Sequence, residues 1–451
     1  MSFPRYPKYK DSGVEWLGQV PEHWEVTALK RVVNPERQIT YGIVQAGPHV
    51  PDGIPYIRPA DMTDEHGVVN HDEVMRTSPE IASGYSRSTI RSGDVVCSIG
   101  PSFGKAMITP EWLDGANLTQ GTARIAVQPP NASHYIFWTL RSPFSVAQWE
   151  SAVGGATFRA LNLAPLAETT ILVPTPTEQT AIAAFLDGET AKIDGLVAEQ
   201  QRLMELLKEK RQAVISHTVT QGLNPHAPMK PSGIEWLGDV PAHWDLRATK
   251  RLFRLVVDPA PDDNHYELLS IYTEIGVRPR KELEAKGNKA TTTDGYWKVQ
   301  KGDLIVNKLL AWMGAIGISD YDGVTSPAYD ILRKRVPMEP RYYDFLFRCG
   351  ICFSEFRRYS RGIMDMRLRL YFDELGQLVM PYPPESEQQE IVGFIQQELA
   401  RFDALSAEAQ RAIDLLQERR TALISAAVTG QIDVRANVAS AQAKRVVSVG
   451  T

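Results

Sequence analysis

The sequence predicts an α+β protein in which two globular domains of mixed α/β structure are separated by two long coiled-coil helices. Two internal repeats predict this organisation. A box at Ser12–Trp24, SGVEWLGQVPEHW, recurs at Ser232–Trp244, SGIEWLGDVPAHW, with ten of thirteen positions identical. A longer segment at 178–223 recurs at 387–432 with 21 of 46 positions identical. One arrangement therefore occurs twice, with a different insert in each copy.

The first copy is expected to fold as a domain over residues 1–177. Gly93-Asp94 is a turn signal before the apolar stretch Val95–Ile99, which predicts a buried strand. Three further elements are expected: a second strand, a compact helical stretch rich in aromatic residues, and a last strand before the helix start. They span 122–127, 134–149 and 170–173.

A long helix is expected at 178–223 and again at 387–433. In both segments the residues that recur every third or fourth position form the seam of a coiled coil. The seam is predicted to comprise Ile193, Leu196, Gln200, Leu203, Leu207, Lys210 and Val214 in the first helix, and Phe402, Leu405, Ala409, Ala412, Leu416, Arg419 and Leu423 in the second.

Signals for the helix ends accompany these segments. Ser386 with Gln389 has the spacing of a capping box, and Thr177 is the expected cap of the first helix. Gly222 and Gly430 stand where a left-handed residue is expected to end each helix.

The second copy is expected to fold as a domain over 224–386. Gly302-Asp303 precedes the apolar stretch 304–307, at the same place as the Gly-Asp turn of the first copy. Further strands are expected at 329–333 and 377–380, with a helical stretch at 342–359. The tail at 434–451 has no hydrophobic period and is expected to be disordered.

Composition predicts an ordinary globular protein of the cytoplasm. The chain has 451 residues, a formal net charge of −5 and three cysteines, which give no disulfide framework. No apolar run approaches the roughly 18 residues of a spanning helix, and the N-terminal residues lack a signal-peptide pattern. Charge is uneven: the stretch 245–384 has 22 Lys and Arg against 19 Asp and Glu, whereas 385–433 has 4 against 9. The basic balance of the second insert is compatible with local DNA contact.

Short motifs suggest no catalytic or metal site. Cys349 and Cys352 form an isolated CxxC, which is short of the four ligands of a structural zinc site and is interpreted as two core cysteines. His66 and His71 are interpreted as exposed loop histidines. Asp262 with Glu284 and Lys286 matches a loose nuclease pattern, but no buried strand is predicted to present the pair.

Cofactor motifs are also missing from the sequence. We find no glycine-rich loop for S-adenosylmethionine, no Asn-Pro-Pro-Phe-type pocket for a flipped adenine and no phosphate-binding P-loop. The chain is therefore predicted to be non-catalytic and to hold no cofactor.

In the order of its motifs the chain resembles the specificity (S) subunit of type I restriction–modification systems. This order is a box ending in Pro-x-His-Trp, a variable α/β region, a Glu-Gln pair that starts a long helix, and then the whole again. The resemblance covers nearly all of the chain except the tail. It implies that the two variable regions are target-recognition domains, each of which reads one half of a bipartite, asymmetric DNA site.

The resemblance also implies the arrangement and the partners. The two helices would lie antiparallel as a spacer with pseudo-two-fold symmetry, and they would dock two methyltransferase (M) subunits. Restriction (R) subunits would join the full complex, and the partners would use S-adenosylmethionine, and ATP with Mg²⁺. Two other functions stay open from the residues alone: a non-enzymatic coiled-coil adaptor that joins two protein-binding domains, and an enzyme of nucleic-acid chemistry.

Candidate DNA-contacting residues are polar and lie in the inserts, because specificity requires what differs between the two copies. Arg and Lys can contact guanine or phosphate, and Asn and Gln can read adenine. A glycine followed five residues later by an arginine precedes the last strand of each insert. The candidates are Lys105, Gln120, Arg159 and Asn162 in the first insert, and Lys308, Arg358, Arg361, Arg367 and Arg369 in the second. The alternative is that these are ordinary surface residues.

Overall fold

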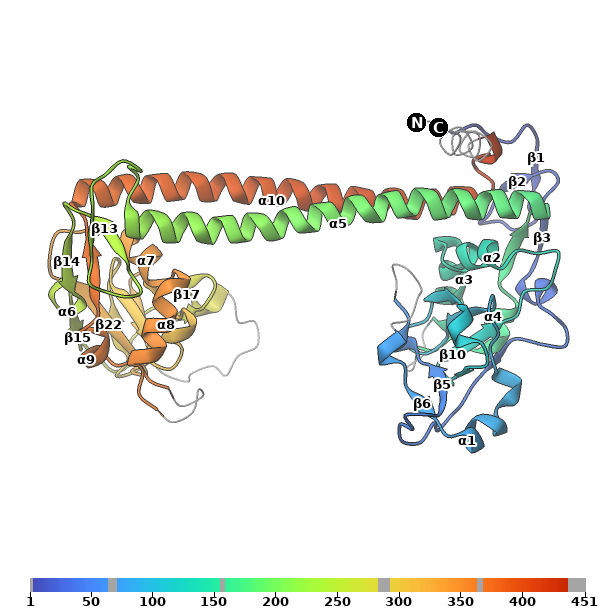
Figure 1. Cartoon of the computed structure of the whole chain (residues 1–451), viewed down its shortest axis with the longest axis horizontal. Coiled ribbons are helices and arrows are strands. Elements are labelled where there is room, and N and C mark those ends of the chain that lie inside the picture. Colours follow the sequence, from blue (N-terminus) through green and yellow to red (C-terminus); the bar gives the residue numbers. More distant parts are fainter. Residues whose placement is uncertain (1–2, 64–70, 155–158, 283–292, 363–367, 437–451) are drawn as a thin grey trace. The chain divides into compact units, whose positions relative to one another are not determined.

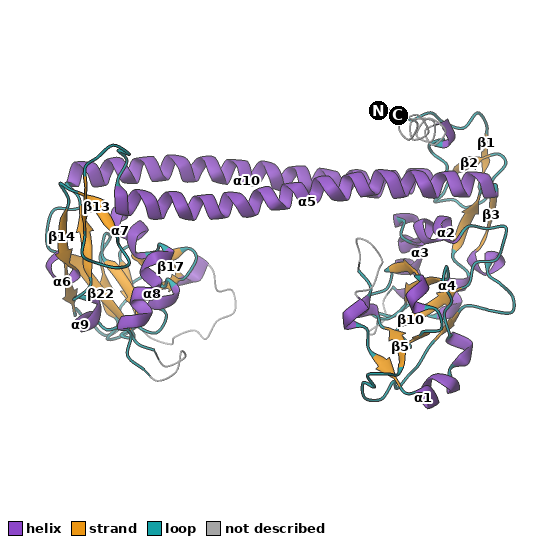
Figure 2. Cartoon of the chain, in the orientation of Figure 1, coloured by secondary structure: helices purple, strands orange, loops and turns teal. Residues whose placement is uncertain are grey.

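The structure is a computed structural model that describes residues 3–63, 71–154, 159–282, 293–362 and 368–436. The chain forms two compact units: unit 1 comprises residues 1–200 and 411–451, and unit 2 comprises residues 201–410. Both units are mixed α/β, which confirms the predicted fold class at this level (Figure 1, Figure 2). Each unit includes part of both long helices, α5 (Pro176–Gln221) and α10 (Glu385–Val428).

Unit 1 is built on an antiparallel sheet with the strand order β4-β10-β7-β8. A second sheet has the order β6-β5-β9, β1 pairs with β2, and β11 pairs with β3 just before α5. The strands are β1 (Tyr9–Asp11), β2 (Gln19–Pro21), β3 (Glu25–Ala28), β4 (Thr40–Tyr41), β5 (Ile54–Ile57), β6 (Arg76–Thr77), β7 (Val95–Ser98), β8 (Ala106–Ile108), β9 (Asn117–Leu118), β10 (Thr122–Ile125) and β11 (Thr170–Val173).

The helices of unit 1 besides α5 and α10 are short: α1 (Pro79–Gly84), α2 (Ser133–Leu140), α3 (Pro143–Val153) and α4 (Leu163–Ala167). The single helical stretch predicted at 134–149 is therefore wrong in its continuity. Pro143 disfavours helical backbone at the preceding residue and lacks the N–H that would continue the ladder. Ser142 caps the new helix by accepting a hydrogen bond from the N–H of Ser145.

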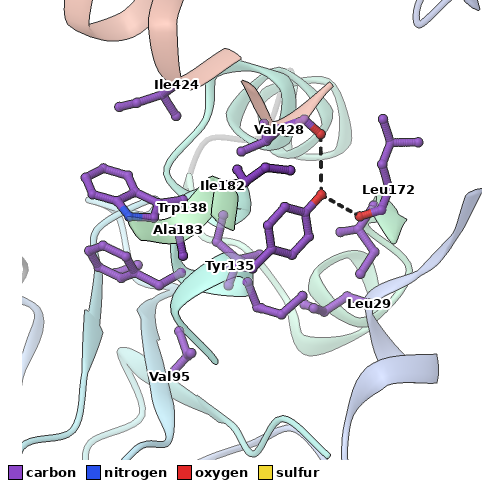
Figure 3. Packing of buried hydrophobic residues seen from close by; sticks show 14 of the residues in the cluster. Leu29, Val95, Tyr135, Trp138, Leu172, Ile182, Ala183, Ile424 and Val428 are labelled. Carbon is purple, nitrogen blue, oxygen red and sulfur yellow. Dashed lines mark hydrogen bonds between the residues drawn. The ribbon is translucent and has the colours of Figure 1, made fainter. Parts of the chain in front are cut away.

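The end of α10 is part of the core of unit 1 (Figure 3). Tyr135 on α2 is fully buried, and its hydroxyl lies 2.8 Å from the carbonyl oxygen of Leu172 on β11 and 3.5 Å from that of Val428 on α10. Around this ring pack Leu29, Trp138, Ile182, Ala183 and Ile424, all in one buried cluster. Residues from the beginning, the middle and the end of the sequence therefore share one hydrophobic core.

Unit 2 has an antiparallel sheet with the order β15-β22-β19-β20. β14 pairs with β23 just before α10, and β12 pairs with β13. The strands are β12 (Met229–Pro231), β13 (Asp239–Pro241), β14 (Asp245–Ala248), β15 (Phe253–Val256), β16 (Leu269–Tyr272), β17 (Gly276–Pro279), β18 (Trp297–Val299), β19 (Leu304–Asn307), β20 (Ile316–Ile318), β21 (Gly323–Thr325), β22 (Tyr329–Lys334) and β23 (Val379–Tyr382). The strand predicted at 377–380 thus begins two residues later.

The short helices of unit 2 are α6 (Thr249–Leu252), α7 (Pro340–Phe347), α8 (Gly350–Tyr359) and α9 (Phe372–Leu375). Here too the predicted stretch at 342–359 divides in two, because the backbone of Cys349 is extended and α8 starts after it. The hydroxyl of Tyr342 donates to the carbonyl oxygen of Val219 at 2.7 Å, so the end of α5 is held in the core of unit 2.

Within each unit a part of α5 lies antiparallel to a part of α10. In unit 1, Arg420 donates to Asp194 at 2.9 Å, while Val428 and Ile182 share the core cluster. In unit 2, Arg211 is paired with Asp403, while Val219 and Ile391 share a cluster. Residue numbers therefore rise along α5 as they fall along α10 in both units.

The prediction of the coiled-coil seam is correct at every second position only. Ile193, Gln200, Leu207 and Val214 face inward as predicted, but the residues between them are one place further on. Leu196 and Leu203 are 46% and 41% exposed, and Lys210 is exposed; Val197, Met204 and Arg211 take the inner positions. The same shift replaces Leu405, Ala412 and Arg419 by Ser406, Ile413 and Arg420. The inward-facing residues are therefore spaced by four and then three residues, whereas the leucines at the predicted positions had suggested three and then four.

The helix starts also differ from the prediction. The first helix begins at Pro176, and Thr175 rather than Thr177 is its cap: the Thr175 hydroxyl and the Glu178 carboxylate bond each other's backbone N–H groups at 3.4 and 3.3 Å. The second helix begins at Glu385, so Ser386 already lies inside it. Proline at the first helical position pre-sets the helical φ angle, which explains the earlier start of the first helix.

The predicted helix stops are confirmed at Gly222 and Gly430, whose φ angles are +74° and +70°. The disorder predicted from residue 434 onward is, however, wrong at Val434. Val434 is fully buried in the core of unit 1, and the N–H of Asp433 donates to the carbonyl oxygen of Pro4 at 2.8 Å. Residues 437–451, the rest of the predicted tail, lie outside the described residues.

Candidate nucleic-acid interface

Each unit contains a junction at which the loop after a central strand meets the segment before the last strand. In unit 1 the N–H of Leu161 donates to the carbonyl oxygen of Ile99, just after β7, at 2.9 Å. In unit 2 the N–H of Leu370 donates to the carbonyl oxygen of Lys308, just after β19, also at 2.9 Å. Both residues of one bond lie 209 positions from their counterparts in the other. We call these pairs of segments the loop junctions; most of the candidate DNA-contacting residues lie on them.

The loop junction of unit 1 carries Arg159. Its side chain is 57% exposed and forms an ion pair with Glu150, which is 49% exposed. Its guanidinium also lies over the ring of Phe103, 6.0 Å from the ring centre. Asn162 is exposed at the start of α4 and makes no capping bond through its side chain. These two side chains are accessible from solvent.

The other candidates of unit 1 differ in availability. Lys105 is partly buried, and its Nζ donates to the carbonyl oxygen of Met62 at 2.9 Å. Gln120 is exposed, while its backbone N–H is held by the carbonyl oxygen of Ile43 at 2.9 Å. A fixed backbone with a solvent-facing amide suits Gln120 for contacts outside the unit.

The loop junction of unit 2 places Arg361 and Arg369 opposite each other. Each N–H donates to the other's carbonyl oxygen, at 2.8 and 2.9 Å. The Arg361 side chain is 73% exposed and pairs with Glu374 on α9, whose side chain is only 10% exposed. Arg369 donates through Nη1 to the carbonyl oxygen of Leu368 at 3.1 Å. Arg367 lies outside the described residues.

Lys308 and Arg358 complete the candidates of unit 2. The Lys308 side chain is 20% exposed; its Nζ lies 3.0 Å from the carbonyl oxygen of Pro327 and 3.3 Å from Asp330 Oδ1. Burial raises the pKa of Asp330, although the Lys308 ammonium opposes this shift. Arg358 is 64% exposed on α8, 3.5 Å from Glu355. Lys308 is thus largely committed to internal partners.

In both units an aromatic ring in the loop after the central strand lies beneath an arginine, a feature that the sequence reasoning missed. Trp312 in unit 2 lies 209 positions after Phe103, and the guanidinium of Arg357 lies 5.3 Å from its ring centre. The constant offset between the two copies is the signal that could have identified this pair of positions.

The repeated boxes serve as anchors and lie apart from the candidate residues. Trp24 and Trp244 are fully buried, as predicted. His23 Nε2 lies 2.9 Å from Glu178 Oε1, and His243 Nε2 lies 2.8 Å from Glu387 Oε2, so each box is joined to the start of the helix that follows its insert.

Each anchoring tryptophan also packs on a helix end. A Cβ atom at Gly430 would lie 3.1 Å from the Trp24 ring, and one at Gly222 would lie 3.2 Å from the Trp244 ring. Glycine is therefore required at both helix ends for close packing as well as for its φ angle.

The CxxC pair, the two loop histidines and the loose nuclease pattern do not form a catalytic or metal site among the described residues. Cys349 and Cys352 are fully buried with their sulfur atoms 3.9 Å apart. His71 is exposed, whereas His66 lies outside the described residues. Asp262 is exposed, and Glu284 and Lys286 lie outside the described residues. Within the described ranges, no three His, Cys, Asp or Glu side chains gather in a group that could hold a metal ion.

Comparison with known proteins agrees with this architecture. Residues 21–203 match the model of the type I restriction modification DNA specificity domain. The chain is 27% identical over 201 residues to the type I restriction enzyme EcoBI specificity subunit of Escherichia coli, a match that covers 44% of this chain and 41% of that protein. It is 20% identical over 326 residues to the EcoDI specificity subunit of the same organism, covering 66% and 70%.

Two solved structures share the fold. The HsdS subunit from Thermoanaerobacter tengcongensis superposes with a TM-score of 0.55 at 16% identity, covering 91% of this chain and 98% of that one. A chain from a study of complex assembly and conformational transition of the type I R-M system gives a TM-score of 0.64 at 16% identity, covering 91% and 99%. In the described part of the chain, no helix has the length and apolar character needed to cross a membrane.

Proposed function

Because the chain belongs to the family of type I restriction–modification specificity subunits, we propose that it is the DNA-recognition subunit of such a complex. It recognises a bipartite, asymmetric DNA site, and each of its two inserts reads one half. The target-recognition domains correspond to residues 1–177 and 224–386, the spacer helices to 178–223 and 387–433. The two domains, each with its helix, form an internal repeat with pseudo-two-fold symmetry. The protein works in the cytoplasm, where its DNA is.

The loop junctions carry this proposal. The same backbone hydrogen bond, Leu161 to Ile99 and Leu370 to Lys308, holds the same two segments in each unit. The side chains presented at the junctions differ, however: Arg159 and Asn162 in one, Arg361 and Arg369 in the other. A constant backbone with different polar side chains is what the reading of two different base sequences requires.

The long helices are proposed to bind two copies of one methyltransferase subunit. Large apolar side chains recur on the outer faces of α5 and α10 at identical repeat positions. Leu196 and Leu405 are 46% and 39% exposed, and Leu206 and Leu415 are 51% and 66% exposed. Leucines at this exposure leave apolar surface open to solvent, so their repetition favours a partner that is the same at both places.

Catalysis is assigned to the partners under this proposal. The methyltransferase subunits would use S-adenosylmethionine, and restriction subunits would use ATP with Mg²⁺. The role of this chain is to present each half of the site in a fixed position, which needs no cofactor of its own.

The test is to map methylated sites in DNA modified by the chain together with a methyltransferase subunit of its own system. The expected result is one bipartite motif. Arg159→Ala should lose discrimination in one half only, by roughly 1–3 kcal/mol for a bidentate base contact. A uniform loss of affinity with a shallower salt dependence would instead make Arg159 a phosphate contact. Absence of sequence-specific DNA binding by the wild-type complex would refute the proposed function.

A further inference from the structure

We propose that Glu374 is a positioning residue for DNA recognition, which holds the guanidinium of Arg361 so that its outer edge reads a guanine. The inference rests on the proposed function and deepens it by naming one specificity-determining pair in unit 2. Glu374 lies on α9, outside the set of candidates that the sequence suggested.

The burial of Glu374 is the first observation. Its side chain is 10% exposed, and neither carboxylate oxygen accepts a regular hydrogen bond from another residue within the described ranges. Its charge is met by Arg361 Nη2. An ionised carboxylate that is removed from water must be paired, and removal of its partner is strongly unfavourable. Arg361 is therefore not free to move away from Glu374.

The exposure of Arg361 is the second observation. Although one end of its guanidinium is tied to a buried group, the side chain is 73% exposed. A guanidinium has five N–H donors in a rigid plane, so contact with one carboxylate leaves donors for another acceptor. The two parallel donors of such an edge match the O6 and N7 atoms of guanine in the major groove.

The backbone of Arg361 is fixed as well. Its N–H and carbonyl groups both form hydrogen bonds with Arg369. Leu370, which follows Arg369, donates its N–H to the carbonyl oxygen of Lys308 after β19. Leu370 is fully buried, which ties this segment to the core. With the main chain and the side chain both held, little conformational entropy remains to be lost when DNA binds. Such pre-organisation favours a base contact over a loose phosphate contact.

Arg159 in unit 1 provides the contrast. Its partner Glu150 is 49% exposed and can be hydrated when the pair separates, so the pair constrains the arginine weakly. The two ion pairs therefore differ in how firmly they hold the arginine. Glu374 positions its arginine, whereas Glu150 does not.

The experiment measures base preference with the full chain in complex with its methyltransferase subunit. Bound duplexes are selected from a randomised library, and binding of the selected duplex and of its single-base variants is then measured at several salt concentrations. Glu374→Gln should lower discrimination at one guanine position in one half-site by roughly tenfold. Arg361→Ala should affect the same position, and the double variant should lose no more than Arg361→Ala alone. Glu150→Gln, the matched control, should leave the selected motif unchanged.

Glu374→Asp guards against a merely structural effect, because it keeps the charge and withdraws the carboxylate by one methylene group. It should also weaken discrimination at that position while thermal unfolding of the complex stays close to wild type. Unchanged base preference in folded Glu374→Gln or Glu374→Asp would overturn the proposal. Uniformly weaker binding to all sequences with a shallower salt dependence would also overturn it, because Arg361 would then contact phosphate. Failure of the wild-type complex to select any sequence would instead refute the proposed function itself.

Discussion

The two units hold their exposed arginines in different ways on the same backbone. In unit 2, Arg361 is backed by a carboxylate that water hardly reaches, whereas in unit 1 Arg159 shares an exposed pair with Glu150 and lies over Phe103. The frame of boxes and helix ends recurs in both units, and its anchoring residues Trp24 and Trp244 are fully buried. Under the proposed function, the repeated residues serve assembly and the divergent ones serve recognition, so changes in the two classes should have separable effects.

Exchange of a whole insert should have the largest effect. Replacement of residues 245–384 by the matching insert of a relative should change one half of the recognised site completely and leave the other half as it was. The box and the helix ends of unit 2 stay in place, and distant sites contribute nearly independently. Mapping of methylated sites checks this expectation. A swap that altered both halves, or neither, would show that the inserts do not read DNA separately.

Removal of an anchoring tryptophan should have the next largest effect. Trp24→Ala and Trp244→Ala each empty a fully buried site against a helix end, and each should lower the free energy of unfolding by about 3–5 kcal/mol. Trp16→Ala is the control, because this ring lies in the same box but is 56% exposed. Denaturant unfolding of the three variants provides the measurement. Equal losses for Trp16 and Trp24 would contradict the anchoring role.

Sequence patterns were sufficient for the frame, because its residues recur in both copies. The boxes, the helix stops and the strands after the Gly-Asp turns all lie where the repeats predict them. The hydrophobic pattern was insufficient to decide which of two neighbouring apolar residues faces the partner helix. Leu196 and Leu203 are apolar enough for a seam position, and only packing shows that Val197 and Met204 occupy it.

The acidic residues that hold the candidate side chains could not be predicted from the sequence. Nothing in the sequence links Arg361 to Glu374, which are thirteen positions apart and are brought together by the fold of α9. The sequence predicts Lys308 as a DNA-contacting side chain, but in the structure it forms an ion pair with Asp330. By contrast, the rings at Phe103 and Trp312 could have been predicted from the offset of 209 between the copies.

A smaller, pH-dependent effect is expected at the anchor of unit 1. Burial alone would raise the pKa of Glu178, but hydrogen bonds from His23 and Thr175 hold it below the ordinary value of 4.5. A carboxyl group whose pKa is depressed by folding stabilises the protein fully above about pH 4.5 and loses this contribution as the pH falls through the lowered value.

Glu178→Gln should therefore reduce stability at neutral pH and flatten the acid limb of a plot of unfolding temperature against pH. Glu22→Gln serves as the control, because Glu22 is an exposed glutamate of the box whose His23 contacts Glu178. An acid limb as steep in Glu178→Gln as in wild type would exclude this carboxylate as the source.

The smallest expected effect distinguishes the two ion pairs between α5 and α10. Arg420 and Asp194 in unit 1 are 17% and 24% exposed, whereas their repeat counterparts in unit 2, Arg211 and Asp403, are 39% and 64% exposed. Solvent screens the second pair more, so Arg211→Ala should cost about 0.2–1 kcal/mol and Arg420→Ala somewhat more. Arg420 also lies 5.9 Å from the ring centre of Trp138, a contact that its removal would lose as well.

Double-mutant cycles with Asp403→Ala and Asp194→Ala isolate the two pair energies. Raised salt should weaken the pair of unit 2 more than that of unit 1, because exposed charges are screened more strongly than partly buried ones. Equal coupling energies with equal salt dependence would mean that the helix contacts are as open to solvent in unit 1 as in unit 2, and the difference in exposure would then have no energetic consequence.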